Sequence, residues 1–250
     1  MSNESSKPLL KKSALITGAS RGIGEAIAHS LAAAGAHVII GARSEDQLQK
    51  VADAINSSGG KATPVVFDVS NKDECEKFIE KARDVSGNPD FLINNAGLGV
   101  FRPIEKFQDD EFEKQFRINV FGPFYLTRSC VPLMKENGRG HIVNVSSLAG
   151  KNSAKMGSGY FATKWAIQGF SKCVFEDVRE HNIKVTTVCP GSVDTRFHVD
   201  SHPGSHPKDQ SWMVSPEEVA DSVLHLLLQP DHCIVSDLDI RPTNKPKQKK

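Results

Sequence analysis

The sequence predicts an α/β fold with a single doubly wound parallel sheet and helices on both of its faces. Short β-branched runs alternate with longer helical stretches, which is the order of repeated strand–helix–strand units. Residues 38–40 and 142–145 are almost continuously apolar, as in strands that are buried on both faces of a parallel sheet. The chain of 250 residues has the length of one well-buried domain, and no composition shift marks a second.

Each expected strand is a short run rich in β-branched or aromatic residues, and each expected helix is a longer stretch between two such runs. In chain order, the expected strands are 13–17, 37–41, 63–67, 91–94, 141–145, 184–189 and 234–240. The expected helices are 23–34, 45–57, the charged stretch 72–85, 109–134, a segment from Tyr160 to about 181, and 216–228. Pro216 suits the first turn of the last helix, because the N–H that proline lacks has no partner there.

Charge and cysteine content exclude several classes of protein. A net charge of +1 produces no basic field for nucleic acid, so we expect no nucleic-acid partner. The five cysteines are scattered and form no Cys-x-x-Cys pair, which predicts reduced thiols in a cytoplasmic protein without a structural metal site. No apolar run approaches the ~18 residues of a membrane span, and the N-terminus lacks the apolar core of a secretory signal.

These observations predict three parts of the chain. We expect a flexible N-terminus at 1–11, a single domain at 12–240 and a flexible tail at 241–250. The tail carries five basic residues, which fit either a solvated end or a contact with an anionic surface.

Three glycines follow the first expected strand, in Thr17-Gly18-Ala19-Ser20-Arg21-Gly22-Ile23-Gly24. Their spacing is not Gly-x-Gly-x-x-Gly, but glycine still permits a tight turn and close approach of the backbone. The next helix would offer its N-terminal N–H groups to a pyrophosphate. The pattern therefore favours a nucleotide-binding loop over a plain strand-to-helix turn. The predicted contacts come from Gly18, Ser20, Arg21, Gly22, Ile23 and Gly24.

The second expected strand ends in Gly41-Ala42-Arg43-Ser44. A site for NAD normally has an acidic residue here that binds the ribose hydroxyls, and this chain has none. Arg43 stands beside that position, and Arg21 lies in the glycine loop. Two guanidinium groups near one ribose suit a 2′-phosphate better than they suit bare hydroxyls. The sequence therefore predicts NADP(H) as the cofactor, against the alternative of two merely exposed arginines.

Tyr160 and Lys164 are four residues apart in an expected helix, so they share one face of it. A free phenol, with a pKa of about 10, is a poor proton shuttle near neutral pH, and an adjacent cation lowers that pKa. Lys164 alone is not expected to bring it to about 7, but a second positive charge, such as an oxidised nicotinamide, would help. By itself the spacing also fits a surface lysine beside a half-buried tyrosine.

Two further strand ends should meet the rim that carries Gly18, because the carboxyl ends of parallel strands lie together. Small and amide residues in Asn94-Asn95-Ala96-Gly97 can line an adenosine site. Ser147 follows the fifth strand and precedes Tyr160 by enough chain to face it. Asn119 stands inside an expected helix, where asparagine is unfavourable, so it is either functional or solvent-facing.

Taken together, these residues resemble the short-chain dehydrogenase/reductase family over roughly residues 12–228. Five motifs occur in the family's order: Thr17-Gly18-x-x-x-Gly22-x-Gly24, Asn94-Asn95-Ala96-Gly97, Asn119, Ser147 with Tyr160 and Lys164, and Pro190-Gly191-x-x-x-Thr195. The resemblance implies a Rossmann-like fold and a catalytic tetrad of Asn119, Ser147, Tyr160 and Lys164. It implies further cofactor contacts from Asp68 and Val69 at the adenine, from Asn95, Ala96 and Gly97, and from Pro190, Gly191, Val193 and Thr195 near the nicotinamide.

The predicted reaction is hydride transfer from NADPH to a carbonyl carbon, with Tyr160 as the proton donor. Lys164 would lower the pKa of Tyr160 and hold the ribose hydroxyls, while Ser147 donates a hydrogen bond to the substrate oxygen. The resemblance implies that Asn119 holds a water behind Lys164.

The expected substrate is a small ketone, dicarbonyl or pterin, and a 3-oxoacyl group on an acyl carrier protein is the alternative. A protein that binds or senses NADP without turnover, or a binding module that acts through the basic tail, is the alternative of another class. Residues 197–215 have the length of an active-site lid. The family resemblance implies a homo-oligomer. Members often end the last strand in an Asp-Gly-Gly-type turn that this chain lacks, so homodimer and homotetramer both stay open.

Overall fold

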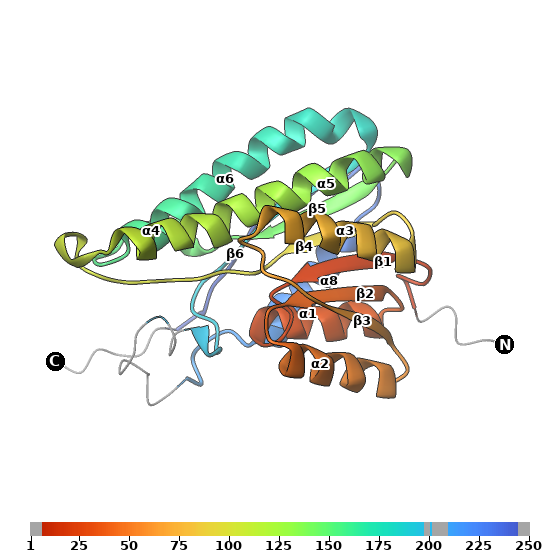
Figure 1. Cartoon of the computed structure of the whole chain (residues 1–250), viewed down its shortest axis with the longest axis horizontal. Coiled ribbons are helices and arrows are strands. Elements are labelled where there is room, and N and C mark those ends of the chain that lie inside the picture. Colours follow the sequence, from red (N-terminus) through yellow and green to blue (C-terminus); the bar gives the residue numbers. More distant parts are fainter. Residues whose placement is uncertain (1–6, 198–200, 202–209, 245–250) are drawn as a thin grey trace.

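Seven strands of the described residues form one parallel sheet, in the order β3-β2-β1-β4-β5-β6-β7 (Figure 1). The structure is a computed structural model, and it describes residues 7–197, 201 and 210–244. The strands are β1 (Ser13–Thr17), β2 (His37–Ala42), β3 (Lys61–Val66), β4 (Phe91–Asn94), β5 (Gly140–Val145), β6 (Ile183–Pro190) and β7 (Asp237–Ile240). Chain order reverses between β1 and β4, so the predicted doubly wound sheet is confirmed and its switch point lies there.

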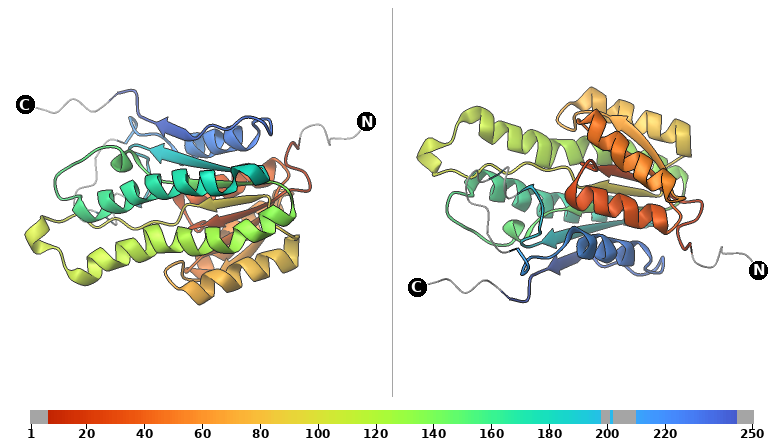
Figure 2. Two further views of the ribbon diagram at one scale, coloured as in Figure 1. Left: turned by 90° about the horizontal axis from the view of Figure 1, so that it is seen from above. Right: turned by 90° about the horizontal axis from the view of Figure 1, so that it is seen from below.

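Helices cover both faces of the sheet, as predicted (Figure 2). One layer contains α1 (Gly22–Ala33), α2 (Glu45–Ser57) and α8 (Pro216–Leu227), and the other contains α3 (Lys72–Ser86), α5 (Gly122–Glu136) and α6 (Ser158–Val178). Neighbouring strand residues alternate between two apolar cores: Ile16 packs with the first layer and Leu15 with the second. Burial on both faces explains why the strands read as continuous apolar runs.

The expected helix 109–134 is divided in the structure. It consists of α4 (Asp109–Phe116), a π-helical turn Arg117–Phe121, and α5. Other differences are at element ends: the third strand is 61–66 instead of 63–67, the last is 237–240 instead of 234–240, and the final turn after α6 is 3₁₀ over Arg179–His181. Pro64 is tolerated within β3 because β3 is an edge strand.

The start of α8 follows the prediction made from Pro216. Pro216 occupies the first turn, and a capping box encloses it. Ser215 N donates to Glu218 Oε2 at 2.7 Å, and Glu218 N donates to Ser215 Oγ at 3.1 Å. These bonds satisfy two N–H groups that the helix itself leaves without partners.

Part of the N-terminus that was predicted to be flexible, 1–11, packs against the domain. Leu9 is buried, with 3% of its surface exposed, and its N–H donates to Ala34 O at 2.9 Å. Residues 7–11 therefore pack beside the end of α1. Residues 1–6, most of the predicted lid (198–200 and 202–209) and the tail residues 245–250 lie outside the described residues.

All five cysteines are free thiols, and Cys75, Cys130 and Cys189 are buried. Among the helices of the described residues, none combines the length and the apolar character that a membrane span requires.

A buried histidine is expected to make the fold sensitive to acid. His141 begins the buried part of β5, and its Nε2 lies 2.8 Å from Thr186 Oγ1. Thr186 uses its hydroxyl proton to donate to Val235 O, so His141 must donate to Thr186 from Nε2. Burial, with a smaller contribution from the charge of Lys184, lowers the pKa of His141 to about 3.

The unfolded chain takes up this proton near pH 6.5, whereas the folded chain resists it until about pH 3. Between these values the contribution of His141 should fall by up to about 1.4 kcal/mol per pH unit as the pH drops. Calorimetric Tm values from pH 7.5 to 4.5 should therefore fall less steeply for His141→Gln than for wild type. Parallel curves for the two proteins would assign the acid sensitivity to other groups.

Candidate active site

A cavity of about 1380 Å³ opens at the carboxyl ends of the strands, around the switch point between β1 and β4. It exceeds the roughly 300–1,000 Å³ of a typical small-ligand pocket. The predicted site residues that line it are Gly18, Ser20, Arg21, Gly22, Ile23, Arg43, Asp68, Val69, Asn95, Ala96, Gly97, Ser147, Tyr160, Lys164, Pro190, Gly191, Val193 and Thr195. The predicted site residues Gly24 and Asn119 do not line the cavity.

The glycine loop allows β1 and β4 to approach closely. Gly18 and Gly22 have φ values of +65° and +61°, a backbone region in which side chains are strained. A Cβ on Gly18 would lie 2.8 Å from Ala96 Cα, and one on Gly24 would lie 2.4 Å from Asn95 Nδ2. Gly24 thus serves the packing of the loop and does not form its cavity surface.

Thr17 is a residue of the site that the sequence reasoning missed. Its Oγ1 accepts hydrogen bonds from Asn95 N at 3.1 Å and from Ala96 N at 3.0 Å. Asn95 Nδ2 in turn donates to Thr17 O at 2.9 Å. The hydroxyl therefore fixes the two strand ends against each other. The signal in the sequence is a polar residue that ends an apolar strand immediately before the glycines.

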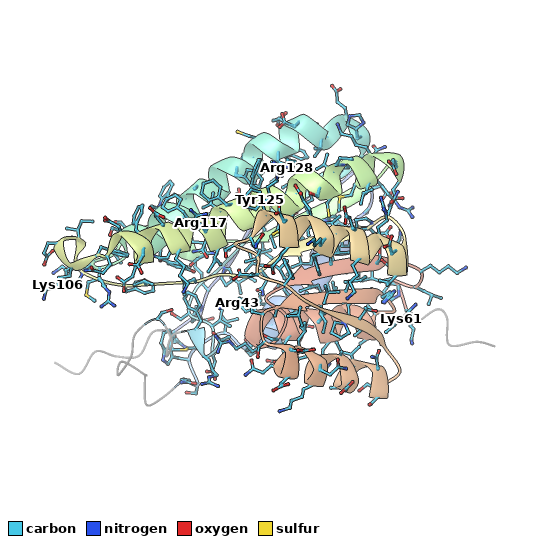
Figure 3. The ribbon with its side chains drawn as sticks, in the orientation of Figure 1. Arg43, Lys61, Lys106, Arg117, Tyr125 and Arg128 are labelled. Carbon is cyan, nitrogen blue, oxygen red and sulfur yellow. The ribbon has the colours of Figure 1, made fainter. Side chains whose placement is uncertain are left out.

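Two helix N-termini border the cavity without side-chain caps. Arg21 precedes α1 and Ser44 precedes α2, and neither makes a side-chain capping bond. First-turn N–H groups lack partners within their own helix and carry the positive end of the helix dipole, so both ends suit anions. Arg43 is exposed beside the start of α2, at the end of the sheet where the strands stop (Figure 3). The glycine cradle and these helix ends fit a phosphate-bearing dinucleotide.

The loop after β3 supplies the predicted adenine-side residues. Asp68 Oδ1 accepts from Ser70 N at 2.9 Å and from Ser70 Oγ at 2.8 Å, while Asp68 N donates to Glu74 at 2.7 Å. Val69 is buried against Gly122, where a Cβ would lie 2.6 Å from Val69 Cγ2. The loop is thus held firmly where it meets the cavity.

Tyr160 and Lys164 lie on one face of α6 and both are buried, with 8% and 5% of their surfaces exposed. The alternative of a surface lysine beside a half-buried tyrosine is therefore wrong. Lys164 Nζ lies 5.6 Å from the centre of the Tyr160 ring and donates to Val145 O at 2.9 Å. Burial lowers the pKa of Lys164 to about 8, and the nearby Cys189 acts weakly in the opposite direction.

The sequence predicts that Lys164 lowers the pKa of Tyr160. For the protein without a bound cofactor, this prediction is wrong. Burial raises the pKa of Tyr160 to about 12, because the phenolate would lose its hydration. A hydrogen bond with Ser147 acts in the opposite direction but is the smaller effect. The sequence reveals that Lys164 is a neighbour, but it does not reveal how deeply the phenol is buried.

Ser147 stands between Tyr160 and the loop after β6. Its Oγ accepts from Ala149 N at 3.1 Å and donates to Pro190 O at 3.4 Å. A hydroxyl has one proton, so Ser147 donates either to Pro190 or to the oxygen of Tyr160. The bond to Pro190 is long and therefore weak, so redirecting this proton into the cavity costs little.

Asn119 lies in the π-helical turn and is 1% exposed, which excludes the solvent-facing alternative. Its Oδ1 accepts from Leu98 N at 2.8 Å, and its Nδ2 donates to Leu98 O at 2.8 Å and Thr163 Oγ1 at 3.0 Å. Thr163 Oγ1 donates to Tyr160 O at 2.7 Å. Asn119 thus joins the loop after β4 to the helix that carries Tyr160.

Three phenylalanine side chains line the part of the cavity nearest Tyr160, and the sequence did not indicate that they meet there. They are Phe101, Phe161 and Phe197. Trp212, from the segment expected to be a lid, also lines the cavity. Phe101 follows β4 and Phe197 follows β6, so only the folded chain brings them together. Within the described part of the chain, no three His, Cys, Asp or Glu side chains are grouped as metal ligands would be.

A family model described as short chain dehydrogenase matches residues 12–205. The chain belongs to the short-chain dehydrogenase family. It is an oxidoreductase of this family, as the sequence predicts. An uncharacterised oxidoreductase of Staphylococcus aureus (strain MW2) is 34% identical to it over 234 residues, 94% of this chain and 98% of that protein.

Two solved structures are similar to this chain along almost its whole length. An alcohol dehydrogenase from the archaeon Thermococcus sibiricus, complexed with 5-hydroxy-NADP, has a TM-score of 0.85 and 33% identity, covering 94% of this chain and 99% of that one. A metagenomic short-chain oxidoreductase in complex with NADP has a TM-score of 0.83 and 35% identity, covering 95% and 100%.

Proposed function

We propose that this protein is an NADPH-dependent reductase that converts a ketone or other carbonyl group into an alcohol. The observation that carries the proposal is the buried pair of Tyr160 and Lys164, which lines the same cavity as the glycine loop. The similarity of this chain to structures solved with NADP and 5-hydroxy-NADP supports the choice of cofactor. Residues 12–240 would form the catalytic domain.

The proposed cofactor site runs along the strand ends. The uncapped start of α1 and the glycine loop would hold the pyrophosphate, and Arg43 with Arg21 would hold the 2′-phosphate. Asp68, Val69, Asn95, Ala96 and Gly97 would surround the adenosine. Pro190, Gly191, Val193 and Thr195 would position the nicotinamide. Bound NADPH would supply the hydride that reduces the carbonyl carbon.

Tyr160 is the proposed general acid. Its raised pKa, about 12 from burial, keeps the phenol protonated at neutral pH, as an acid that donates to a carbonyl oxygen requires. In the reverse direction the phenolate is needed, so oxidation should be faster at high pH. The positive charge of Lys164 would oppose the effect of burial and stabilise that phenolate.

Ser147 and Asn119 complete the proposed tetrad in different ways. Ser147 would turn its proton from Pro190 O to the substrate oxygen, where negative charge develops. Both N–H donors of the Asn119 side chain are used by Leu98 and Thr163, so the water behind Lys164 that the family resemblance implies would donate to an oxygen of Asn119.

A homodimer or homotetramer in the cytoplasm belongs to the same proposal. Exposed apolar side chains on α5 and α6 support self-association, because burying them would remove apolar surface from water. Phe124 packs its ring edge-on to Phe170 at 6.4 Å, and Arg128 lies 5.1 Å over Phe124. Figure 3 shows Arg128 and Tyr125 along α5. Light scattering after gel filtration would determine the number of subunits.

A turnover assay tests the proposed reaction. NADPH oxidation would be followed at 340 nm with a panel of ketones, dicarbonyls and a pterin, and with a 3-oxoacyl thioester as the alternative substrate. Consumption of NADPH that depends on one of these carbonyl compounds supports the proposal. Tight NADPH binding without turnover of any compound would favour an NADP-sensing protein instead.

Arg43→Ala is expected to reduce the preference for NADPH over NADH by about 10–100-fold. A charged hydrogen bond contributes roughly 1.5–3 kcal/mol, and about 1.4 kcal/mol corresponds to a factor of ten. NADH lacks the 2′-phosphate, so its KM should change little. Steady-state kcat/KM for the two cofactors gives the ratio. Arg21→Ala should have a weaker effect of the same kind.

Lys50→Ala is the matched control, because it removes one positive charge from α2 outside the cavity. It should leave the cofactor preference unchanged. Equal losses with NADPH and NADH in Arg43→Ala would mean that Arg43 does not bind the 2′-phosphate.

A further inference from the structure

Three phenylalanine rings surround the ring of Tyr160. The centres of Phe101 and Phe197 lie 5.4 Å and 5.5 Å from it, each tilted by 47°. Phe161 lies edge-on at 6.3 Å. All three line the cavity. The space beside the Tyr160 hydroxyl is therefore bordered by aromatic surface.

Phe101 and Phe197 close over the main chain at Gly99. A Cβ on Gly99 would lie 2.9 Å from Phe101 Cε2 and 2.7 Å from Phe197 Cζ. The φ of Gly99 is not in the left-handed region, so its backbone would accept alanine without strain. What excludes a side chain at Gly99 is chiefly the position of the two rings, and Ser201 Oγ, 3.2 Å from the added Cβ, is the next obstacle. The loops after β4 and β6 thus meet in one aromatic contact.

We propose that Phe101 and Phe197 select substrates with a flat aryl group beside the carbonyl carbon. The inference rests on the proposed reductase function. A carbonyl oxygen that reaches the hydroxyls of Tyr160 and Ser147 brings its substituents within ring distance of Phe101 and Phe197. Aromatic rings favour offset or edge-to-face contacts with other rings, and two tilted rings offer both. Among ketones, dicarbonyls and pterins, an aryl ketone matches the aromatic surface of Phe101 and Phe197.

The first test compares three methyl ketones with the wild-type enzyme and NADPH. Acetophenone carries a flat ring, cyclohexyl methyl ketone a bulky saturated ring, and 2-butanone a short chain. The kcat/KM for acetophenone should exceed that for each of the others by at least about tenfold, which corresponds to ~1.4 kcal/mol. Similar values for acetophenone and cyclohexyl methyl ketone would overturn the inference. Failure to reduce any carbonyl compound would instead count against the reductase function.

The second test substitutes Gly99 and leaves both phenylalanines in the sequence. Gly99→Ala should push Phe101 and Phe197 apart and reduce the preference for acetophenone over 2-butanone by about tenfold, mainly through KM. The control is Gly169→Ala on α6, where no atom lies within 4 Å of an added Cβ. It should keep the wild-type preference.

Phe197→Leu tests the preference for acetophenone independently, because it keeps an apolar side chain and removes only the ring. It should reduce the same preference by about threefold or more, in line with one aromatic contact. If both Gly99→Ala and Phe197→Leu keep the wild-type preference, Phe101 and Phe197 do not determine specificity.

Discussion

Replacing Tyr160 by phenylalanine is expected to lower kcat by about 10²–10⁴-fold, the usual contribution of a general acid. The ring contacts with Phe101 and Phe197 do not involve the hydroxyl, so packing around α6 should persist. NADPH binding, measured by the change in its fluorescence, should stay within about tenfold of wild type, since one neutral hydrogen bond contributes only ~0.5–1.5 kcal/mol.

Tyr125→Phe is the matched control, because it removes the hydroxyl of the chain's second tyrosine. Tyr125 lies on α5 and does not line the cavity (Figure 3). Its activity should equal that of wild type. If Tyr160→Phe kept more than about a tenth of wild-type kcat, another group would have to supply the proton.

Lys164→Met is expected to be the second most damaging change. In the alcohol-oxidising direction the base is the Tyr160 phenolate, so activity should rise with pH up to the pKa of Tyr160. Burial raises that pKa to about 12, and the charge of a nearby ammonium would act in the opposite direction. Without the ammonium the pKa rises, and each unit lowers the phenolate fraction at neutral pH by about tenfold. The pH profile of kcat should therefore shift upward, or activity should be lost.

Lys172→Met removes an exposed ammonium from the same helix and should keep the wild-type profile. Lys164 also donates to Val145 O, so circular dichroism and Tm must establish that Lys164→Met is folded. A folded Lys164→Met variant with an unshifted profile and substantial activity would remove Lys164 from the mechanism.

The sheet and its cofactor rim could be predicted from the sequence because their signals are local. Strands buried on both faces must be apolar throughout, and the glycines at Gly18 and Gly22 are required by their own φ values. Tyr160 and Lys164 share a helix face by their spacing alone. Alternating strands and helices predict a parallel sheet, whose strand carboxyl ends lie at one rim, whereas the strand order came from the structure.

The features that required the tertiary structure are those that depend on distant parts of the chain. The π-helical turn at Asn119 is stabilised by bonds to Leu98 and Thr163, and neither residue is a neighbour in sequence. Leu9 is buried because it meets the end of α1, although the composition around it resembles a solvated terminus. In both cases a partner far along the chain overrides the local preference.

The family, the doubly wound parallel sheet and the pairing of Tyr160 with Lys164 could all be predicted from local patterns in the sequence. The direction in which the Tyr160 pKa shifts required the folded structure, because desolvation depends on everything that surrounds the phenol and not on its helix neighbour alone. The folded structure also decided the aromatic surface beside Tyr160, since Phe101 and Phe197 come from separate loops that meet over Gly99. Periodicity and turn chemistry are encoded over a few residues, whereas burial is a property of the whole packed chain.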